Sequence, residues 1–277
     1  MSGLSDRNAF KIAVFFYGLS LLYSVLLWKR GFKRTEMWNY GFLAGAFIFH
    51  SIAMVKRGFS LERCPINNLY EATTFITWTI VLGYLVVGAW PRLRFLGAFG
   101  APLFFSVGIF SLMPDLDRHF SGETDFGGGF VSLHAAAILL SYGAFGLAAV
   151  SSLVYVSADH DLKFDKMRAL MSELPSVDRL DRVNCLAMGI GLALLTIGLL
   201  MGVRISVVGE MPFVSDPKVK WSLLVWLIYL SMLMARFKGG FRGKGFAMGT
   251  LVAFAFVLLT FWGFNLISGI HNPVGAG

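Results

Sequence analysis

The sequence predicts an all-α, polytopic integral membrane protein with about eight transmembrane helices. Of its 277 residues, 56% are apolar and only 14% are charged, whereas a soluble domain carries about 25% charged residues. The mean hydropathy is +0.69. A membrane-spanning helix needs about 20 mainly apolar residues, so eight helices with short loops account for nearly the whole chain. Residues 1–277 should therefore form a single transmembrane domain.

Eight apolar runs mark the expected spans in order along the chain. They cover residues 11–28, 39–55, 72–90, 94–113, 131–157, 185–203, 221–236 and 246–269. The first run follows Arg7 and Lys11 but lacks a small-residue cleavage site, so it is expected to be an ordinary span rather than a signal peptide. The fourth run contains Pro102 and the sixth contains Gly191, and membrane helices tolerate both residue types. Gly143 in the fifth run suits close helix packing.

Lysine and arginine are shared unequally between alternate loops. The loops 29–38, 91–94, 158–184 and 236–245 hold 15 of the 24 basic residues. Cytoplasmic loops of membrane proteins carry the excess of positive charge. This set of loops is therefore expected to be cytoplasmic, which makes both termini extracytoplasmic.

The longest of these inner loops contains a short amphipathic stretch at residues 162–174. Met167, Leu170, Met171 and Leu174 follow the spacing of one helix face, with charged residues on the other side. This pattern predicts an interfacial helix on the inner membrane surface. It could dock a partner or act as a simple connector.

The composition also excludes several classes of function. A net charge of +8 could suggest a nucleic-acid partner, but the basic residues form short clusters between apolar runs, where they orient a membrane protein. No nucleic acid is therefore expected. Cys64 and Cys185 form no CxxC pattern, so a redox role is unsupported. Because P-loop, HExxH and GxSxG motifs are also missing, we name no catalytic residue.

The predicted topology sorts the five histidines. His119 and His160 fall in polar loops, where solvent exposure is expected. His134 opens the fifth span and His271 closes the eighth, so both should project at the same outer level of the bundle. Two facing imidazoles can fill both axial positions of a haem iron or hold one metal ion. Alternatively, each histidine caps its helix or lies among the lipid headgroups.

Two further features near the predicted outer face could contribute to a ligand site. His50 lies in the outer half of the second span, where an ionisable group is a functional candidate; a packed, hydrogen-bonded histidine is the alternative. The loop 204–220 places Arg204, Asp216 and Lys218 around an apolar segment. Such a loop could cover a flat macrocycle while a cation pairs with its carboxylates, or it could be an ordinary polar loop.

Five motifs along most of the chain resemble those of the CcsA/HemX-type cytochrome c assembly family. Residues 64–71 (CPINNLYE) resemble P-x-S-N-x-Y-E-S. His134 with residues 141–145 (SYGAF) resembles the family's histidine-plus-SYAxF helix, and residues 174–184 (LPSVDRLDRVN) resemble L-P-S-x-x-x-L-D-x-x-N. Residues 216–229 (DPKVKWSLLVWLIY) resemble D-P-K-x-x-W-x-x-x-x-W-L-I-Y, and residues 265–271 (NLISGIH) resemble N-x-x-x-S-G-x-H.

The resemblance implies a membrane protein that presents haem on the outer side of the membrane for attachment to apocytochrome c. In the family, two outer histidines flank a tryptophan-rich (WWD) loop and ligate haem, and these roles carry over by motif to His134 and His271. Asp216 matches the last aspartate of that loop. Two features depart from the family, because residues 204–215 contain no tryptophan and Met234 stands where some relatives carry histidine. These departures favour a divergent, HemX-like branch, a type linked to control of tetrapyrrole synthesis.

We therefore predict a haem-handling protein of the bacterial inner (cytoplasmic) membrane that holds non-covalent, b-type haem near the outer face for cytochrome c biogenesis. The predicted cofactor-binding residues are His134, His271, Asp216, His50, Arg204 and Lys218, with the first two as iron ligands. The expected partners are haem, the lipid bilayer, another cytochrome c assembly subunit and apocytochrome c. The chain is at most a component of a haem–cytochrome c ligation system. The alternatives are a HemX-like regulatory or scaffolding protein without haem ligation and a small-molecule transporter.

Overall fold

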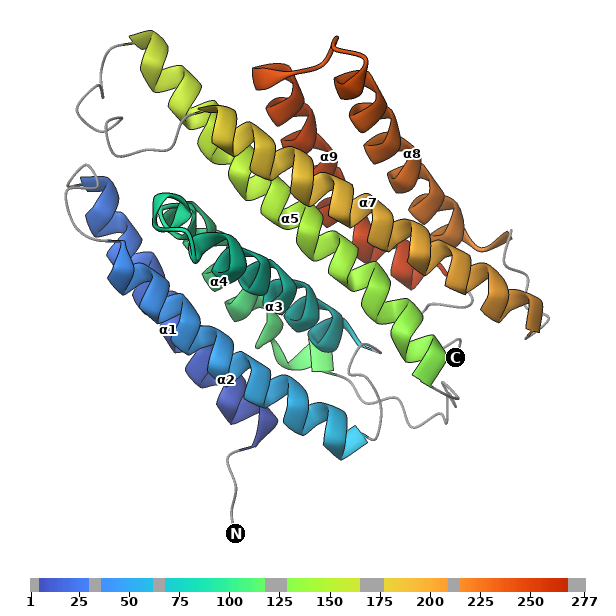
Figure 1. Cartoon of the computed structure of the whole chain (residues 1–277). Coiled ribbons are helices and arrows are strands. Elements are labelled where there is room, and N and C mark those ends of the chain that lie inside the picture. Colours follow the sequence, from blue (N-terminus) through green and yellow to red (C-terminus); the bar gives the residue numbers. More distant parts are fainter. Residues whose placement is uncertain are drawn as a thin grey trace.

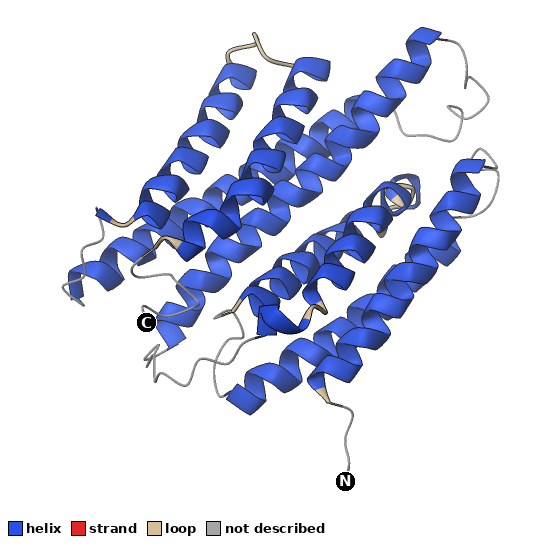
Figure 2. Ribbon diagram, turned by 180° about the vertical axis from the view of Figure 1, so that it is seen from behind, coloured by secondary structure: helices blue, strands red, loops and turns tan. Residues whose placement is uncertain are grey.

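The computed structural model describes residues 5–29, 36–61, 68–117, 129–164, 177–208 and 215–268, and this part of the chain is helical with no strand (Figure 2). The α-helices are α1 (Asp6–Lys29), α2 (Met37–Leu61), α3 (Leu69–Gly88), α4 (Leu96–Ser111), α5 (Gly129–Phe164), α7 (Val177–Val208), α8 (Pro217–Phe237) and α9 (Gly243–Leu266). Two short 3₁₀ helices, η1 (Pro91–Leu93) and η2 (Pro114–Asp117), flank α4. The prediction of an all-α protein with about eight helices is confirmed.

Seven of the described helices are long and apolar enough to cross a membrane. The eighth, α4, has 16 residues, or about 24 Å at 1.5 Å per residue, which is shorter than the roughly 30 Å hydrocarbon core of a bilayer. Large apolar side chains cover the outside of the bundle; Leu22 and Leu200 are each 66% exposed and Leu259 is 82% exposed. Apolar surface on this scale is unusual for a soluble protein and suits contact with lipid. The protein is therefore a multi-pass membrane protein.

The observed helices extend beyond several of the apolar runs. The predicted span 131–157 lies within α5, which continues to Phe164, and the span 185–203 lies within α7, which begins at Val177. The first residues of the predicted interfacial helix, 162–164, therefore belong to α5. The rest of that predicted helix lies outside the described residues.

The helices form two groups, α1–α4 and α5–α9, which meet mainly where α5 packs against α3 and α4 (Figure 1). The long α5–α7 pair is the most extensive contact, and α1 and α2 form a second antiparallel pair. In the most apolar part of α5, 78% of the residues are buried inside the protein, against 28% in α2. Helix α5 is thus the central element of the bundle.

Small residues bring α5 close to its neighbours. A Cβ atom added to Gly143 would lie 2.2 Å from Cγ2 of Thr79 on α3, well inside ordinary contact distance. The expectation that this glycine permits close helix packing is confirmed.

One end of the bundle carries the start of α1, α3, α5 and α8 and the close of α2, α4, α7 and α9 (Figure 1). We call it the predicted outer end, because the distribution of basic residues predicts that it faces away from the cytoplasm. The predicted site residues that the structure describes belong to helix ends of this set or to the helix halves next to them.

Candidate functional site

His134 lies in the second turn of α5, partly buried against α7. Its Nδ1 atom is 2.7 Å from the backbone carbonyl oxygen of Gly198. A carbonyl oxygen only accepts hydrogen bonds, so Nδ1 is the donor and the neutral ring keeps its lone pair on Nε2. Metal-ligating histidines usually have this arrangement, in which one nitrogen is held by a carbonyl or carboxylate and the other binds the metal.

A cation from α7 reaches the same corner of the bundle. The guanidinium carbon of Arg204 lies 5.4 Å from the ring centre of Phe130 in the first turn of α5. Phe130 and His134 are four residues apart and therefore share one face of the helix. Arg204 itself is exposed. The structure thus brings Arg204 and His134, two of the predicted site residues, to one face of α5.

Asp216 ties the start of α8 to the chain that leaves α9. Its Oδ1 atom accepts the backbone N–H of Lys218 at 2.9 Å, as expected for a helix N-cap. Its Oδ2 atom accepts the hydroxyl of Ser268 at 2.7 Å. The carboxylate is buried and both oxygens are engaged, so Asp216 organises this corner. Ser268 precedes His271 by three residues in the sequence.

Lys218 presents a buried ammonium group between two aromatic rings. The residue is only 7% exposed, and Nζ lies 3.8 Å from the ring centre of Phe261 and 4.4 Å from that of Trp221. Its hydrogen bond to the carbonyl oxygen of Phe261 is long, at 3.5 Å. An ammonium group has three donors. The site therefore has capacity for an anionic group such as a carboxylate.

An apolar cavity of about 290 Å³ begins next to this lysine site. Phe261 and Tyr142 line the cavity together with side chains of α3, α4 and α9. Tyr142 is buried, with its hydroxyl near Ser222 but without a hydrogen bond of normal geometry, and its ring contacts Trp221 at 6.0 Å between centres. His134 lies eight residues before Tyr142 on α5, a distance of about 12 Å along the helix axis.

His50 lies apart from these residues, in the α1–α4 group. It is fully buried; its Nδ1 atom is 2.9 Å from the hydroxyl of Tyr17, and its ring packs edge-on against Phe10. Its Nε2 atom is buried near the backbone of Thr74 without a hydrogen bond of normal geometry. These are the contacts of a packed histidine, and the structure does not bring His50 to the same corner as His134.

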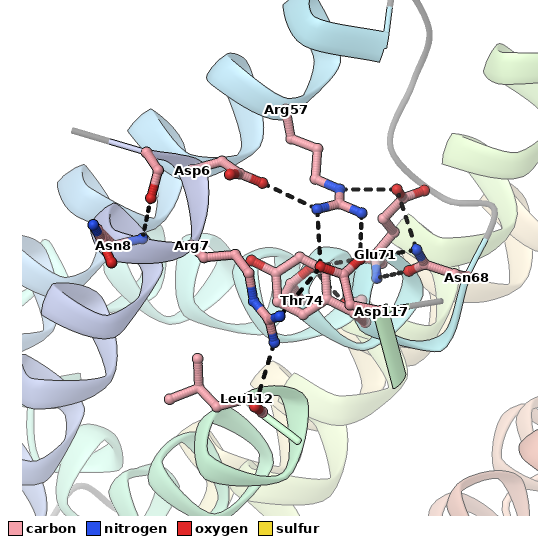
Figure 3. Close-up of polar contacts among 11 residues, drawn as sticks. Asp6, Arg7, Asn8, Arg57, Asn68, Glu71, Thr74, Leu112 and Asp117 are labelled. Carbon is pink, nitrogen blue, oxygen red and sulfur yellow. Dashed lines mark hydrogen bonds and ion pairs between the residues drawn. The ribbon is translucent and has the colours of Figure 1, made fainter. Parts of the chain in front are cut away.

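Sequence reasoning missed a second polar centre, the Arg57 cluster, which consists of Asp6, Arg7, Arg57, Asn68, Tyr70, Glu71 and Asp117 (Figure 3). The buried Arg57 guanidinium donates from Nε to Glu71 at 2.8 Å and from Nη1 to Asp6 at 3.0 Å. It also forms a two-pronged ion pair with Asp117. The ring of Tyr70 lies 4.9 Å from the guanidinium carbon.

The cluster joins four elements at the predicted outer end: the start of α1, the last turns of α2, the start of α3 and η2. Asn68 caps α3 by accepting the backbone N–H of Glu71 at 2.8 Å and also donates to Asp117 at 3.1 Å. Two signals could have revealed the cluster. Asn68, Tyr70 and Glu71 belong to a motif already noted in the sequence, and Arg57 stands just beyond an apolar run, where a charge requires a partner.

A comparison with models of protein families shows which family this chain belongs to. The family model described as "Cytochrome C assembly protein" matches residues 66–271, which is most of the chain. This chain belongs to the cytochrome c assembly protein family. The family resemblance inferred from the five motifs is thereby confirmed.

Full-length relatives agree with this assignment. The cytochrome c biogenesis protein CcsA of Mesostigma viride is 22% identical over 292 residues, which cover 94% of this chain and 92% of the relative. CcsA of Guillardia theta is 25% identical, with 92% and 93% covered. Protein HemX of Bacillus subtilis (strain 168) is also 25% identical, with 92% and 93% covered.

In this cytochrome c assembly protein, the region that matches the family model begins at residue 66, between α2 and α3. Helices α1 and α2 therefore precede the matched region, and α3 to α9 lie inside it. The Arg57 cluster is an ionic contact between the two parts, because Asp6 and Arg57 come from the α1–α2 pair while Glu71 and Asp117 come from the matched region. Hydrogen bonds from Tyr40 to Leu85 and from Trp78 to Ser51 also join them.

One of the two predicted iron ligands, His271, lies outside the described part of the chain, as do Cys64 and the loop residues 209–214. Among the residues that the structure does describe, no group of three or more histidine, cysteine or acidic side chains is arranged to hold a metal ion. The candidate ligand site therefore consists of His134, Arg204, Asp216 and Lys218.

Proposed function

We propose that this cytochrome c assembly protein binds haem at the predicted outer end of its bundle, with His134 and His271 as iron ligands. The observation that carries the proposal is the hydrogen bond from Nδ1 of His134 to Gly198. It leaves Nε2 as a lone-pair donor at the end of the bundle where α9, the helix that leads to His271, also closes. Two histidines can serve as axial ligands of a haem iron.

The other side chains of the site fit a group that is apolar and carries carboxylates. Lys218 offers a buried ammonium with spare donors, and charge-assisted bonds to carboxylates are strong. Arg204 adds an exposed cation beside His134. Trp221 and Phe261 are buried around the Lys218 side chain and would hold it in place beside the bound group. His50 would not belong to this site, because it is enclosed in the other helical group.

The chain's own contribution would be to orient the bound group. When bound, haem supplies the iron and the vinyl groups that react with cysteine thiols of apocytochrome c. The histidines would hold the macrocycle, and Lys218 would pair with a propionate. Holding reactants in a fixed geometry can supply much of a rate enhancement without acid–base catalysis, so this function requires no catalytic residue from the chain.

The absorption spectrum of the detergent-purified protein, oxidised and reduced, tests the proposal. We expect a b-type haem spectrum in the wild type and its loss in the His134→Ala/His271→Ala double variant. His160→Ala is the matched control, because His160 lies in the last turns of α5, at the opposite end of that helix from His134. The expectation that His160 falls in a loop is wrong. Equal haem content in the double variant and the control would refute the ligand assignment.

The predicted orientation and partners need separate experiments. Reporter fusions after residues 29 and 61 should be active on opposite sides of the membrane, with the fusion after residue 61 on the outside. Co-purification with apocytochrome c and with other assembly subunits tests the proposed partners. A cytoplasmic position for residue 61 would reverse the bundle and contradict haem presentation at the outer face.

A HemX-like regulatory role is the second candidate. It is favoured by the lack of tryptophan in residues 204–215, where the motif resemblance calls for a tryptophan-rich loop. A deletion strain separates the two functions. Normal levels of c-type cytochromes together with altered tetrapyrrole synthesis would support regulation, whereas severe loss of c-type cytochromes would support the assembly role.

A further inference from the structure

The contact between α5 and α7 near the predicted outer end depends on a glycine. A Cβ atom added to Gly198 would lie 2.4 Å from Cδ1 and 2.8 Å from Cγ1 of Ile138, and 3.4 Å from the Ile138 backbone nitrogen. The first two distances are far shorter than van der Waals contact. A side chain on residue 198 would therefore require the Ile138 side chain, or the two helices, to move.

The same glycine holds His134. Ile138 follows His134 by four residues, so the two side chains lie one turn apart on the same face of α5. Gly198 thus meets Ile138 with its α-carbon and His134 with its carbonyl oxygen, at 2.7 Å from Nδ1. The close helix contact and the histidine hydrogen bond are two consequences of one packing arrangement.

We infer that Gly198 is the positioning residue that selects Nε2 of His134 as the iron-binding nitrogen. This inference rests on the proposed function. The carbonyl accepts the Nδ1 proton, which fixes both the tautomer and the ring orientation of the imidazole. A hydrogen bond of this kind also makes the second nitrogen a more basic ligand. Gly198 does not touch the bound group and acts only through His134.

The substitution Gly198→Ala should break this arrangement. Relieving a 2.4 Å contact to the 3.4 Å of ordinary packing requires a shift of about 1 Å between α7 and Ile138. Ile138 is β-branched and stiff at its first side-chain torsion, so part of the shift falls on the helices. The part of the shift that falls on the helices lengthens the 2.7 Å hydrogen bond and weakens it.

We expect Gly198→Ala to change the affinity for haem and the midpoint potential of the haem iron. Loss of a partner that orients a metal ligand typically lowers metal affinity by about 10- to 100-fold, and we expect this range for haem binding to purified Gly198→Ala protein. The midpoint potential should rise, because a less basic imidazole stabilises ferric iron less. Equilibrium haem titration and a redox titration of the loaded protein measure the two effects.

A rescue variant separates positioning from general damage. In Gly198→Ala/Ile138→Ala, the atoms that clash with the new methyl group are removed, so the helices can approach and the hydrogen bond can re-form. Haem affinity and potential should return to those of Ile138→Ala alone. Gly189→Ala is the matched control on the same helix, because a Cβ atom at residue 189 meets nothing within 4 Å.

The outcomes distinguish this inference from the proposed function. If His134→Ala retains haem with unchanged affinity, the ligand assignment itself is wrong. If His134→Ala loses haem while Gly198→Ala matches the wild type in affinity and potential, only the positioning role of Gly198 is wrong. Failure of the double variant to recover would also overturn that role, because the loss would then come from damage to the bundle.

Discussion

Replacing Arg57 with methionine would remove the buried cation that Glu71 and Asp117 share. Asp117 would keep its longer ion pair with Arg7, at 3.7 Å. Glu71 has 0% and Asp117 has 5% of its side chain exposed, and the arginine is their shared partner. Removing one member of a buried ion pair typically costs about 3–5 kcal/mol, and the lost contact with the Tyr70 ring adds about 1 kcal/mol. We expect the melting temperature in detergent to fall by on the order of 10 °C.

The neighbouring substitution Lys56→Met is the matched control, because Lys56 is exposed and exposed charges contribute about 0–1 kcal/mol. A further variant tests the cause. Combining Arg57→Met with Glu71→Gln and Asp117→Asn removes the uncompensated charges, so it should recover a large part of the loss. If Arg57→Met melts within about 2 °C of Lys56→Met, the cluster does not stabilise the bundle as argued.

Three further predictions follow from individual contacts. Asp216→Ala removes a helix cap and the acceptor of the Ser268 hydroxyl, so the unfolding free energy should fall by about 2–3 kcal/mol, measured by denaturant titration in detergent. Gly143→Ala places a methyl group against Thr79 and should cost about 1–3 kcal/mol in the same assay. Lys218→Met should weaken haem binding at least about tenfold in equilibrium titration without lowering the melting temperature, because it removes a charged hydrogen-bond donor to the ligand.

The sequence was sufficient to predict the number and order of the helices, because each apolar run must be buried in lipid as a helix. The sequence was not sufficient to predict the lengths of the helices. Helices α5 and α7 continue past their apolar runs with polar residues, which hydropathy interprets as loop. The run at 94–113 forms the short helix α4, because 3₁₀ helices that begin at Pro91 and Pro114 lie on either side of it. Helix α4 is therefore shorter than a full membrane span.

The site was predictable only in part, because motifs locate residues but not their contacts. His134 and Asp216 were found from motif position. That Asp216 uses both oxygens within the protein, and that His50 is enclosed by Tyr17 and Phe10, depends on tertiary packing. The ion pairs of the Arg57 cluster join residues up to 110 positions apart in the sequence, as Arg7 and Asp117 are, and no local pattern specifies which of several acidic residues meets the arginine.

Three sets of bonds join the helices at or near the predicted outer end. The Arg57 cluster holds the α1–α2 pair to α3 and η2, the His134 hydrogen bond holds α5 to α7, and Asp216 holds α8 to the chain beyond α9. All are made by side chains of the protein itself. A ligand that binds at this end would therefore find its helices already ordered, and binding to a preorganised site avoids the entropy cost of arranging it. The three sets share no residues. Weakening one set should therefore lower the affinity for the ligand by loosening only the helices that this set joins, while the other two sets remain intact.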